Sequence, residues 1–193
     1  MYKYADFPNE KREHYENMLK IVGSLSRLFS ENDVPYLDSR VAENLYCKYF
    51  DAENKSRDDS SIDAVYKKAG IGIKTFAGNG AQKVAEFNKD VLIFSNLPAL
   101  QKAKKISELR NKRIQAAKAI YGINEAHYHC IRREKGKMIL CESNMDLIDI
   151  SRLEIAGDNT AKSIKFSDGI NNYIFNISKS VLLKQFPKNN IVS

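Results

Sequence analysis

A lysine in the middle of an apolar strand constrains this chain more than any other feature. The stretch KKAGIGIKTF, residues 67–76, has a turn glycine followed by β-branched and aromatic residues, a pattern typical of a buried strand. Lys74 stands inside it, where a charged side chain loses its hydration. Such a lysine needs either a partner or a chemical task.

The bulk composition indicates a globular protein. The chain has 193 residues, of which 43% are hydrophobic and 28% charged, enough for a sizeable core without metal or disulfides. Three cysteines without a CxxC pair, Cys47, Cys130 and Cys141, predict reduced thiols. No apolar run approaches a membrane span, and the first 16 residues lack a signal peptide's apolar core. We therefore expect a soluble cytoplasmic protein with no membrane partner.

The charge balance favours a polyanionic partner. Lysine and arginine number 31 against 24 acidic residues, which gives a formal net charge of +7. A basic domain attracts nucleic acid through steering and counterion release. The charge favours nucleic acid as a partner without identifying it.

The residue pattern predicts an α+β (mixed) fold. We expect a single domain over residues 1–193, with a central mixed β-sheet flanked by helices and with C-terminal β-hairpins. Residues 1–36 form an N-terminal helical segment in this prediction, residues 37–122 form the core, and residues 123–193 form a β-hairpin region.

Helix signals occur at several places along the chain. Apolar residues at helical spacing predict a helix over residues 8–30. Asp38 or Ser39 can cap a second helix, and a long helix from Pro98 ends near Tyr121, before Gly122. Short helices are expected after the glycine turn in AGNGAQKVAEFNKD, residues 77–90, and over KSVLLKQF, residues 179–186.

Two hairpins are expected in the last third. HYHCIRREKGKMILCES turns at Lys135-Gly136, which places Cys130 opposite Cys141 and His129 opposite Glu142. SIKFSDGINNYIFNIS turns at Asp168-Gly169. One face of this second hairpin carries Ile164, Phe166, Tyr173 and Phe175.

An aspartate precedes the lysine strand. If the strands on either side of the turn at Lys67 to Gly70 pair antiparallel, Asp63 lies near Lys74 across the ladder. Metal-assisted phosphodiester hydrolysis needs such an acid and lysine together with another carboxylate. Carboxylates bind a hard divalent cation, and the lysine positions the attacking water or stabilises charge in the transition state.

These residues resemble the PD-(D/E)XK nuclease superfamily, which includes most type II restriction endonucleases. Its members have an aspartate on one strand and x-x-Lys on the next, as Asp63 and Lys74 do. The usual acid two residues before the lysine is replaced here by Gly72. Some restriction enzymes of the superfamily take this carboxylate from the following helix, and Glu86 has a comparable spacing. Glu43 corresponds to a glutamate on the helix ahead of the first strand.

The resemblance implies a restriction-endonuclease-like core over residues 37–122 and a Mg²⁺-dependent DNA endonuclease, with Mn²⁺ as a possible substitute. It implies catalytic roles for Asp63, Lys74, Glu86 and Glu43, of which Asp63 and Glu86 would hold the metal. It also implies a homodimer that acts on double-stranded DNA. Basic side chains near the core, on the long helix and near residue 180 are candidate DNA contacts: Arg57, Lys104, Lys105, Lys112, Lys179 and Lys184.

Other interpretations stay open at this stage. Lys74 and Asp63 can form a purely structural ion pair, with the lysine stem packed and its head in water. His127 and His129 share one face of a strand and can act as acid and base or bind a metal, although exposed positions near a phosphate backbone fit them better. The chain can also be a non-catalytic DNA-recognition domain of a larger restriction-modification protein, or a protein-interaction domain.

Overall fold

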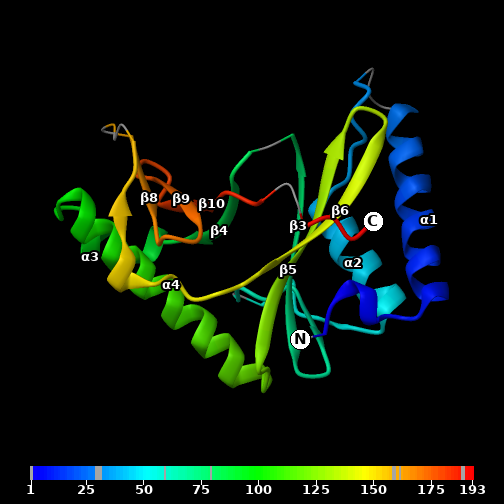
Figure 1. The fold of residues 1–193 in the computed structure, drawn as a ribbon, viewed down its shortest axis with the longest axis horizontal. Coiled ribbons are helices and arrows are strands. Elements are labelled where there is room, and N and C mark those ends of the chain that lie inside the picture. The colour runs from blue at the N-terminus through cyan, green and yellow to red at the C-terminus, as the bar shows by residue number, and fades with distance from the viewer. Residues whose placement is uncertain are drawn as a thin grey trace. The chain divides into compact units, whose positions relative to one another are not determined.

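The computed structural model describes residues 2–28, 32–58, 60–78, 80–157, 160, 162–187 and 190–193. The chain divides into two compact units, each made of separate stretches (Figure 1). Unit 1 contains Met1–Gly78, Ala117–Asp146 and Pro187–Ser193, and unit 2 contains Asn79–Ala116 and Leu147–Phe186. The α+β class is confirmed, whereas the single domain and the nuclease-like core stay predictions.

A mixed sheet forms the centre of unit 1. Its strands lie in the order β1-β2-β3-β5-β6, with β3 parallel to β5 and the other neighbours antiparallel. The strands are β1 (Glu53–Asn54), β2 (Ala64–Tyr66), β3 (Ala69–Ala77), β5 (Glu125–Glu134) and β6 (Lys137–Asn144). The backbone of residues 190–193 extends this sheet by hydrogen bonds to Leu140 and Glu142 of β6.

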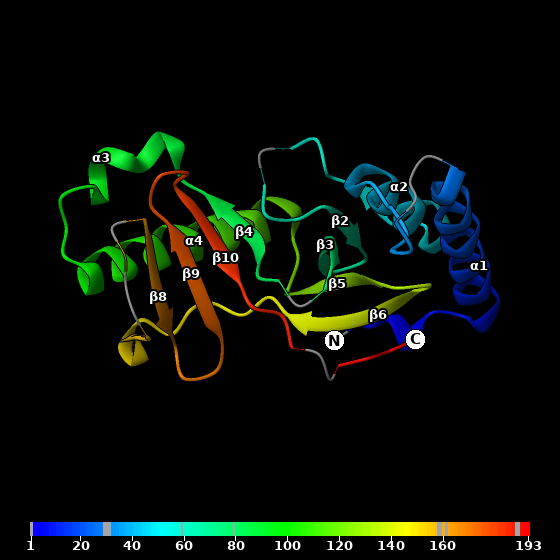
Figure 2. The same ribbon diagram turned by 90° about the horizontal axis from the view of Figure 1, so that it is seen from above.

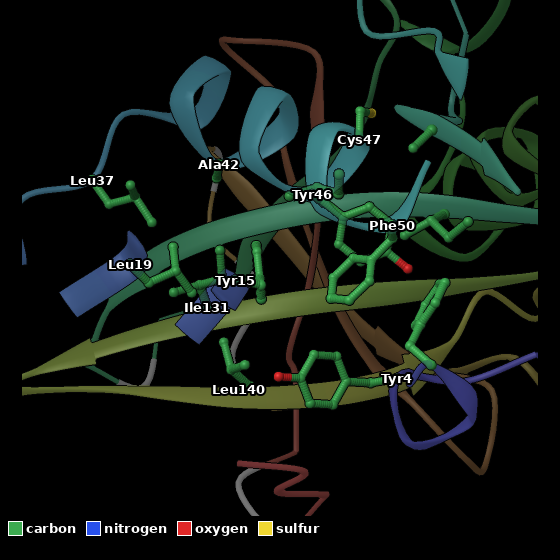
Figure 3. Close-up of a cluster of buried hydrophobic side chains, with 14 of the residues drawn as sticks. Tyr4, Tyr15, Leu19, Leu37, Ala42, Tyr46, Cys47, Phe50, Ile131 and Leu140 are labelled. Atoms are coloured by element: carbon green, nitrogen blue, oxygen red, sulfur yellow. The ribbon is translucent and has the colours of Figure 1, made fainter. Parts of the chain in front are cut away.

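Two helices cover one face of the unit 1 sheet, as Figure 2 shows from above. They are α1 (Asn9–Leu25) and α2 (Ser39–Phe50), and Asp38 caps α2 by accepting a hydrogen bond from the N–H of Arg40, as the sequence predicts. A 3₁₀ turn at Tyr4–Asp6 closes the same core. Figure 3 shows the aromatic rings and aliphatic side chains that pack there: Tyr4, Tyr15, Leu19, Leu37, Ala42, Tyr46, Cys47, Phe50, Ile131 and Leu140.

Unit 2 contains an antiparallel sheet in the order β4-β10-β9-β8-β7. The strands are β4 (Gln82–Glu86), β7 (Glu154–Ile155), β8 (Ser163–Ser167), β9 (Asn172–Asn176) and β10 (Val181–Lys184). The other elements are α3 (Val91–Phe94), the 3₁₀ turns Asn88–Asp90 and Ile150–Arg152, and α4 (Ala99–Tyr121), whose last five residues belong to unit 1. The core combines Phe87 and Phe94 with Ala103 and Ile106 of α4 and the apolar face of the sheet.

Both long hairpins have the predicted register. In the first, β5 and β6 meet at a two-residue turn, and Gly136 has a φ of 70° that favours glycine there. Cys130 lies opposite Cys141 and His129 opposite Glu142. In the second, Ile164 lies opposite Phe175 and Phe166 opposite Tyr173, and all four side chains are buried.

Two predicted helices are wrong. Residues 82–86 and 181–184 are instead the strands β4 and β10, which pair with each other. VLLK, residues 181–184, is a short apolar run whose periodicity does not distinguish a strand from a helix. It forms a strand because it pairs with β9 and β4. The pairing also overrides the helix-forming composition of Gln82–Glu86.

Candidate functional site

The Asp63 carboxylate lies at the end of the β2–β3 ladder. Its Oδ2 accepts a hydrogen bond from the backbone N–H of Ile73 at 2.7 Å and another from Nζ of Lys74 at 3.1 Å. The Asp63 backbone bonds to Ile71 through its N–H and to Lys55 through its carbonyl. Four bonds therefore hold this aspartate, and it in turn fixes the ammonium group of Lys74. The sequence-predicted pair is confirmed.

Lys74 is a half-buried cation. Its side chain is 24% exposed and that of Asp63 is 17% exposed. Burial is the largest single influence and lowers the pKa of Lys74, but the charge and hydrogen bond of Asp63, together with Tyr128 and Cys130, raise the pKa overall. Lys74 is therefore charged at neutral pH and offers its ammonium group beside a fixed carboxylate.

Glu43 joins this pair electrostatically from α2. Burial, and then the negative charge of Asp63, raise the pKa of the half-buried Glu43. A hydrogen bond with Ser56 and the charge of Lys74 act in the opposite direction. Glu43, Asp63 and Lys74, which we call the Lys74 site, thus share one environment, and each was a candidate from the sequence.

Sequence reasoning missed two groups beside the Lys74 site. Cys47 stands one helical turn after Glu43, and burial, followed by the charges of Glu43 and Asp63, raises the pKa of its thiol to about 11. The i, i+4 spacing from Glu43 was the signal that could have found it. Ser56, from the polar loop, acts to lower the pKa of Glu43, while its hydroxyl donates a hydrogen bond to Oδ1 of Asn54 at 2.7 Å; such a loop residue gives no periodic signal.

The glycine at position 72 has a steric cause. A Cβ at this position would lie 2.9 and 3.1 Å from ring carbons of Tyr128 and 2.7 Å from Cε of Met145. Distances below 3.0 Å require a neighbour to move, and the Tyr128 ring is less free to do so than the end of Met145. The acid of the nuclease motif therefore has no room here while Tyr128 keeps its place.

Glu86 lies on a different element from the one expected. It ends strand β4 of unit 2, so the prediction that it projects from a following helix is wrong. Its carboxylate contacts Lys83 at 3.1 Å and accepts a hydrogen bond from Asn88. Both contacts are local and exposed. The predicted role of Glu86 in metal binding depended on that helix, so the structure gives it no support.

The residues predicted to contact DNA differ in how exposed their side chains are. Arg57, Lys104, Lys112 and Lys179 are exposed, and the half-exposed Lys105 pairs with Glu108 at 3.1 Å. Lys184 is 1% exposed and lies over the ring of Phe186, so its prediction as a DNA contact is wrong. The alternating burial of β10 places its side chain in the interior beside that of Leu182.

Not all basic residues of α4 lie on its surface. Two of its basic residues, Lys102 and Arg110, are buried, at 7% and 1% exposed. Nζ of Lys102 donates a hydrogen bond to the carbonyl of Ser95 at 2.9 Å. Lys102 is therefore bonded within unit 2, and neither buried residue contributes to an exposed basic face of α4.

His127 and His129 are buried rather than exposed. The hydroxyl of Tyr15 lies 3.1 Å from Nε2 of His129, and Oε1 of Glu142 lies 3.5 Å from Nε2 of His127. Burial lowers the pKa of His127 to about 4 and that of His129 to about 3. Both are neutral core residues at physiological pH, and exposed positions near phosphate are excluded for them.

The carboxylates of the Lys74 site are its candidate metal ligands. Within the part of the chain that the structure describes, no group of three or more His, Cys, Asp or Glu side chains is placed to hold an ion. Two carboxylates nevertheless face a common environment at the Lys74 site, and the charge of one raises the pKa of the other. Mg²⁺ keeps several waters and commonly binds through one or two carboxylates, so this donor set fits it.

Comparisons with known proteins give no further constraint. No protein-family model matches the chain, no curated protein matches it, and no solved structure matches it. The resemblance to the nuclease superfamily therefore rests on the residues above. Among the helices of the described residues, none combines the length and apolar character needed to span a membrane.

Proposed function

We propose that this chain is a metal-dependent nuclease that hydrolyses phosphodiester bonds in double-stranded DNA, with the Lys74 site as its catalytic centre. The observation that carries the proposal is the placement of Lys74 Nζ 3.1 Å from Asp63 Oδ2, with Glu43 close enough for each charge to act on it. A lysine beside two carboxylates, on a basic chain of net charge +7, is suited to a phosphate substrate.

Asp63 and Glu43 would hold the divalent cation, Mg²⁺ or Mn²⁺. Asp63 Oδ2 is committed to Ile73 and Lys74, which fixes the orientation of the carboxylate. A cation between the two acids would relieve the repulsion that raises the pKa of Glu43. When bound, the cation polarises the phosphate and lowers the pKa of a coordinated water.

Lys74 would stabilise charge on the substrate. Its ammonium group is fixed by Asp63 and remains charged at neutral pH, so it offers a preorganised donor to a phosphate oxygen or to the attacking water.

Cleavage of supercoiled plasmid DNA in Mg²⁺ tests the proposal. Lys74→Met should lower the cleavage rate by about 10²- to 10³-fold, the scale expected for losing a positioned electrostatic group. The matched control is Lys68→Met, an exposed lysine on the same hairpin, which should cleave at the wild-type rate. DNA affinity should be nearly equal in both variants, because one charge contributes little among many phosphate contacts.

The second carboxylate is tested in the same assay. Glu43→Gln should abolish cleavage, and Glu86→Gln should leave it intact. The opposite result would restore Glu86 as the metal ligand. Asp63→Ala should abolish cleavage while retaining or strengthening DNA binding, because a negative charge facing phosphate has been removed.

A second candidate function is DNA recognition without catalysis, as a domain of a larger restriction-modification protein. The exposed Arg57, Lys104, Lys112 and Lys179 support this candidate equally well, because they require phosphate contacts and no chemistry. Wild-type protein that binds duplex DNA but never cuts it in Mg²⁺ or Mn²⁺ would establish this candidate and end the catalytic one. Absence of binding at low salt would exclude both and leave a protein-interaction domain.

The finer predictions follow from the nuclease proposal. By resemblance to restriction enzymes, the protein would act as a type II site-specific endonuclease, as a homodimer and in the cytoplasm. Sedimentation of the protein with and without a DNA duplex measures the dimer directly.

A further inference from the structure

Two cysteines face each other across the centre of the unit 1 sheet. Cys130 of β5 is the register partner of Cys141 of β6; neither cysteine is in a disulfide, and they are 1% and 6% exposed. On the other side of β5, the parallel register places Lys74 of β3 beside Cys130. Lys74, Cys130 and Cys141 therefore form one row across three neighbouring strands.

The backbone geometry of this pair permits a disulfide, with strain. Leu140 and Glu142 direct their N–H groups to the carbonyls of Ser193 and Asn190, away from β5. Because bonding direction alternates along a strand, Cys141 between them faces β5 and forms a hydrogen-bonded pair with Cys130. Such pairs have Cα atoms about 5.5 Å apart, inside the range of about 4.4–6.8 Å found for disulfides.

We propose that Cys130 and Cys141 are a reversible dithiol–disulfide pair that hydrogen peroxide oxidises in the folded protein. The inference is independent of nuclease activity, because it concerns only the state of the two thiols. No other pairing among the cysteines of the described residues has this support, since Cys47 lies on α2.

The oxidation balances as two thiols and one peroxide. The thiolate of Cys130 attacks one peroxide oxygen and breaks the O–O bond, which gives a sulfenic acid at Cys130 and a hydroxide that takes up a proton to form water. The thiolate of Cys141 then attacks the sulfenyl sulfur, forms the S–S bond and displaces hydroxide, which is protonated to a second water. The pair loses two electrons and two protons in total, and the peroxide is reduced to two waters.

Lys74 is the cation beside the cysteine pair. The positive charge of Lys74 interacts with Cys130, which favours its thiolate. Burial raises the pKa of Cys141, and Cys130 is buried as well. The thiol of Cys47 is disfavoured further, since burial and two nearby carboxylates raise its pKa to about 11. We assign Cys130 as the first nucleophile because of its position beside the cation Lys74, and Cys141 as the resolving thiol.

The disulfide should be easy to reduce. Cβ atoms of directly opposed residues lie about 4.5–5.5 Å apart, whereas a disulfide needs about 3.8 Å. Closing this difference strains the two strands, and strained disulfides belong to the labile group that exchanges readily with cellular thiols.

Peroxide treatment of the full chain, followed by thiol counting and peptide mapping, tests the proposal. The wild-type protein should fall from three free thiols to one, and dithiothreitol should restore all three. Trypsin cleaves after Arg132, Arg133, Lys135 and Lys137, so non-reducing mass spectrometry resolves the two cysteines onto separate peptides joined by the new bond. Circular dichroism before and after oxidation verifies that the protein stays folded.

Matched single variants complete the test. Cys47→Ser should form the same cross-link at the wild-type rate, whereas Cys130→Ser and Cys141→Ser should form no internal disulfide. Wild-type protein that keeps three thiols while folded would overturn the proposal. So would a cross-link that contains Cys47, or one that appears only after urea has unfolded the chain. The peptide map of the oxidised wild-type protein alone can confirm or overturn the proposal, so the test does not depend on any variant folding.

Discussion

Nζ of Lys74 and the backbone N–H of Ile73 share one acceptor, Oδ2 of Asp63, at 3.1 Å and 2.7 Å. The two donors are consecutive residues of β3, so a single oxygen both ends the β2–β3 ladder and fixes a cation on the strand. Because Asp63 accepts both bonds and Lys74 makes only one of them, Asp63 should contribute more to the stability of the fold than Lys74.

Asp63→Ala should destabilise the protein more than Lys74→Met. The aspartate change leaves the part-buried Ile73 N–H without its acceptor and removes the partner of Lys74, a loss of about 1–3 kcal/mol. Lys74→Met keeps the Ile73 bond and should cost about 1 kcal/mol or less, the scale of a partly exposed ion pair. Urea unfolding measures both free energies, and equal losses would contradict the shared-acceptor geometry.

Gly72→Ala should destabilise the sheet by about 1–3 kcal/mol, the usual cost of overpacking. The new Cβ would meet the Tyr128 ring at 2.9 Å. Gly80→Ala is a suitable control, because its nearest neighbour would be the end of the Gln82 side chain at 3.6 Å. Gly72→Asp, which restores the acid of the nuclease motif, should be destabilised further and gain no activity; improved cleavage would contradict the steric account.

The stability of the protein should fall between pH 7 and pH 5, because His127 and His129 are buried in their neutral form and resist protonation in the folded state. Their folded pKa values of about 4 and about 3 lie below the ordinary value of 6.5, so the unfolded chain binds more protons in this range. Each histidine should remove about 2 kcal/mol of unfolding free energy over these two pH units. Glu142, whose pKa is raised by burial, lies 3.5 Å from His127, while the charge of Glu125 raises the pKa of His127 and that of Lys3 lowers it.

Urea titrations at pH 5, 6 and 7 measure this effect. His127→Leu should remove about half of the pH dependence, while the exposed His14→Ala should leave it unchanged. A flat stability profile in the wild type would show that the two rings are not held neutral.

The salt dependence of DNA binding tests the remaining basic face of α4. Changing Lys104, Lys105 and Lys112 together to Ala should weaken binding to all sequences and reduce the slope of log K against log salt by about 0.9 for each lost phosphate contact. Because Lys105 already pairs with Glu108, most of the change should come from the other two. Lys20→Ala, on the exposed side of α1, serves as a control; an unchanged slope in the triple variant would mean that this face meets only solvent.

The sequence correctly predicted those features that are determined by residues close together in the chain. The Asp38 cap, the glycine at position 136 and the two-residue spacing of apolar side chains on the second hairpin each act within a few residues. The Asp63–Lys74 contact belongs to the same group, because a tight turn joins the two strands. Register follows from the turn, and the contact follows from register.

The errors concern residues whose environment is set by distant parts of the chain. Strand β10 exists because β9 and β4 lie on either side of it, and nothing within VLLK indicates those partners. Lys184 and Arg110 were taken as surface cations because charged residues are seldom buried, but each is 1% exposed. Position 72 is a glycine because Tyr128, more than fifty residues later, occupies the space of its side chain.

The interleaving of the two units has a consequence for the order of events at the ribosome. Strand β3 acquires its parallel neighbour only when β5 has been made, and the outer side of β6 acquires its bonds from residues 190–193, after all of unit 2. The polypeptide emerges from its N-terminus, and long-range pairings form slowly. The emerging chain therefore holds Lys74 beside Asp63 early, but that hairpin has an open strand edge until more than fifty further residues have been translated.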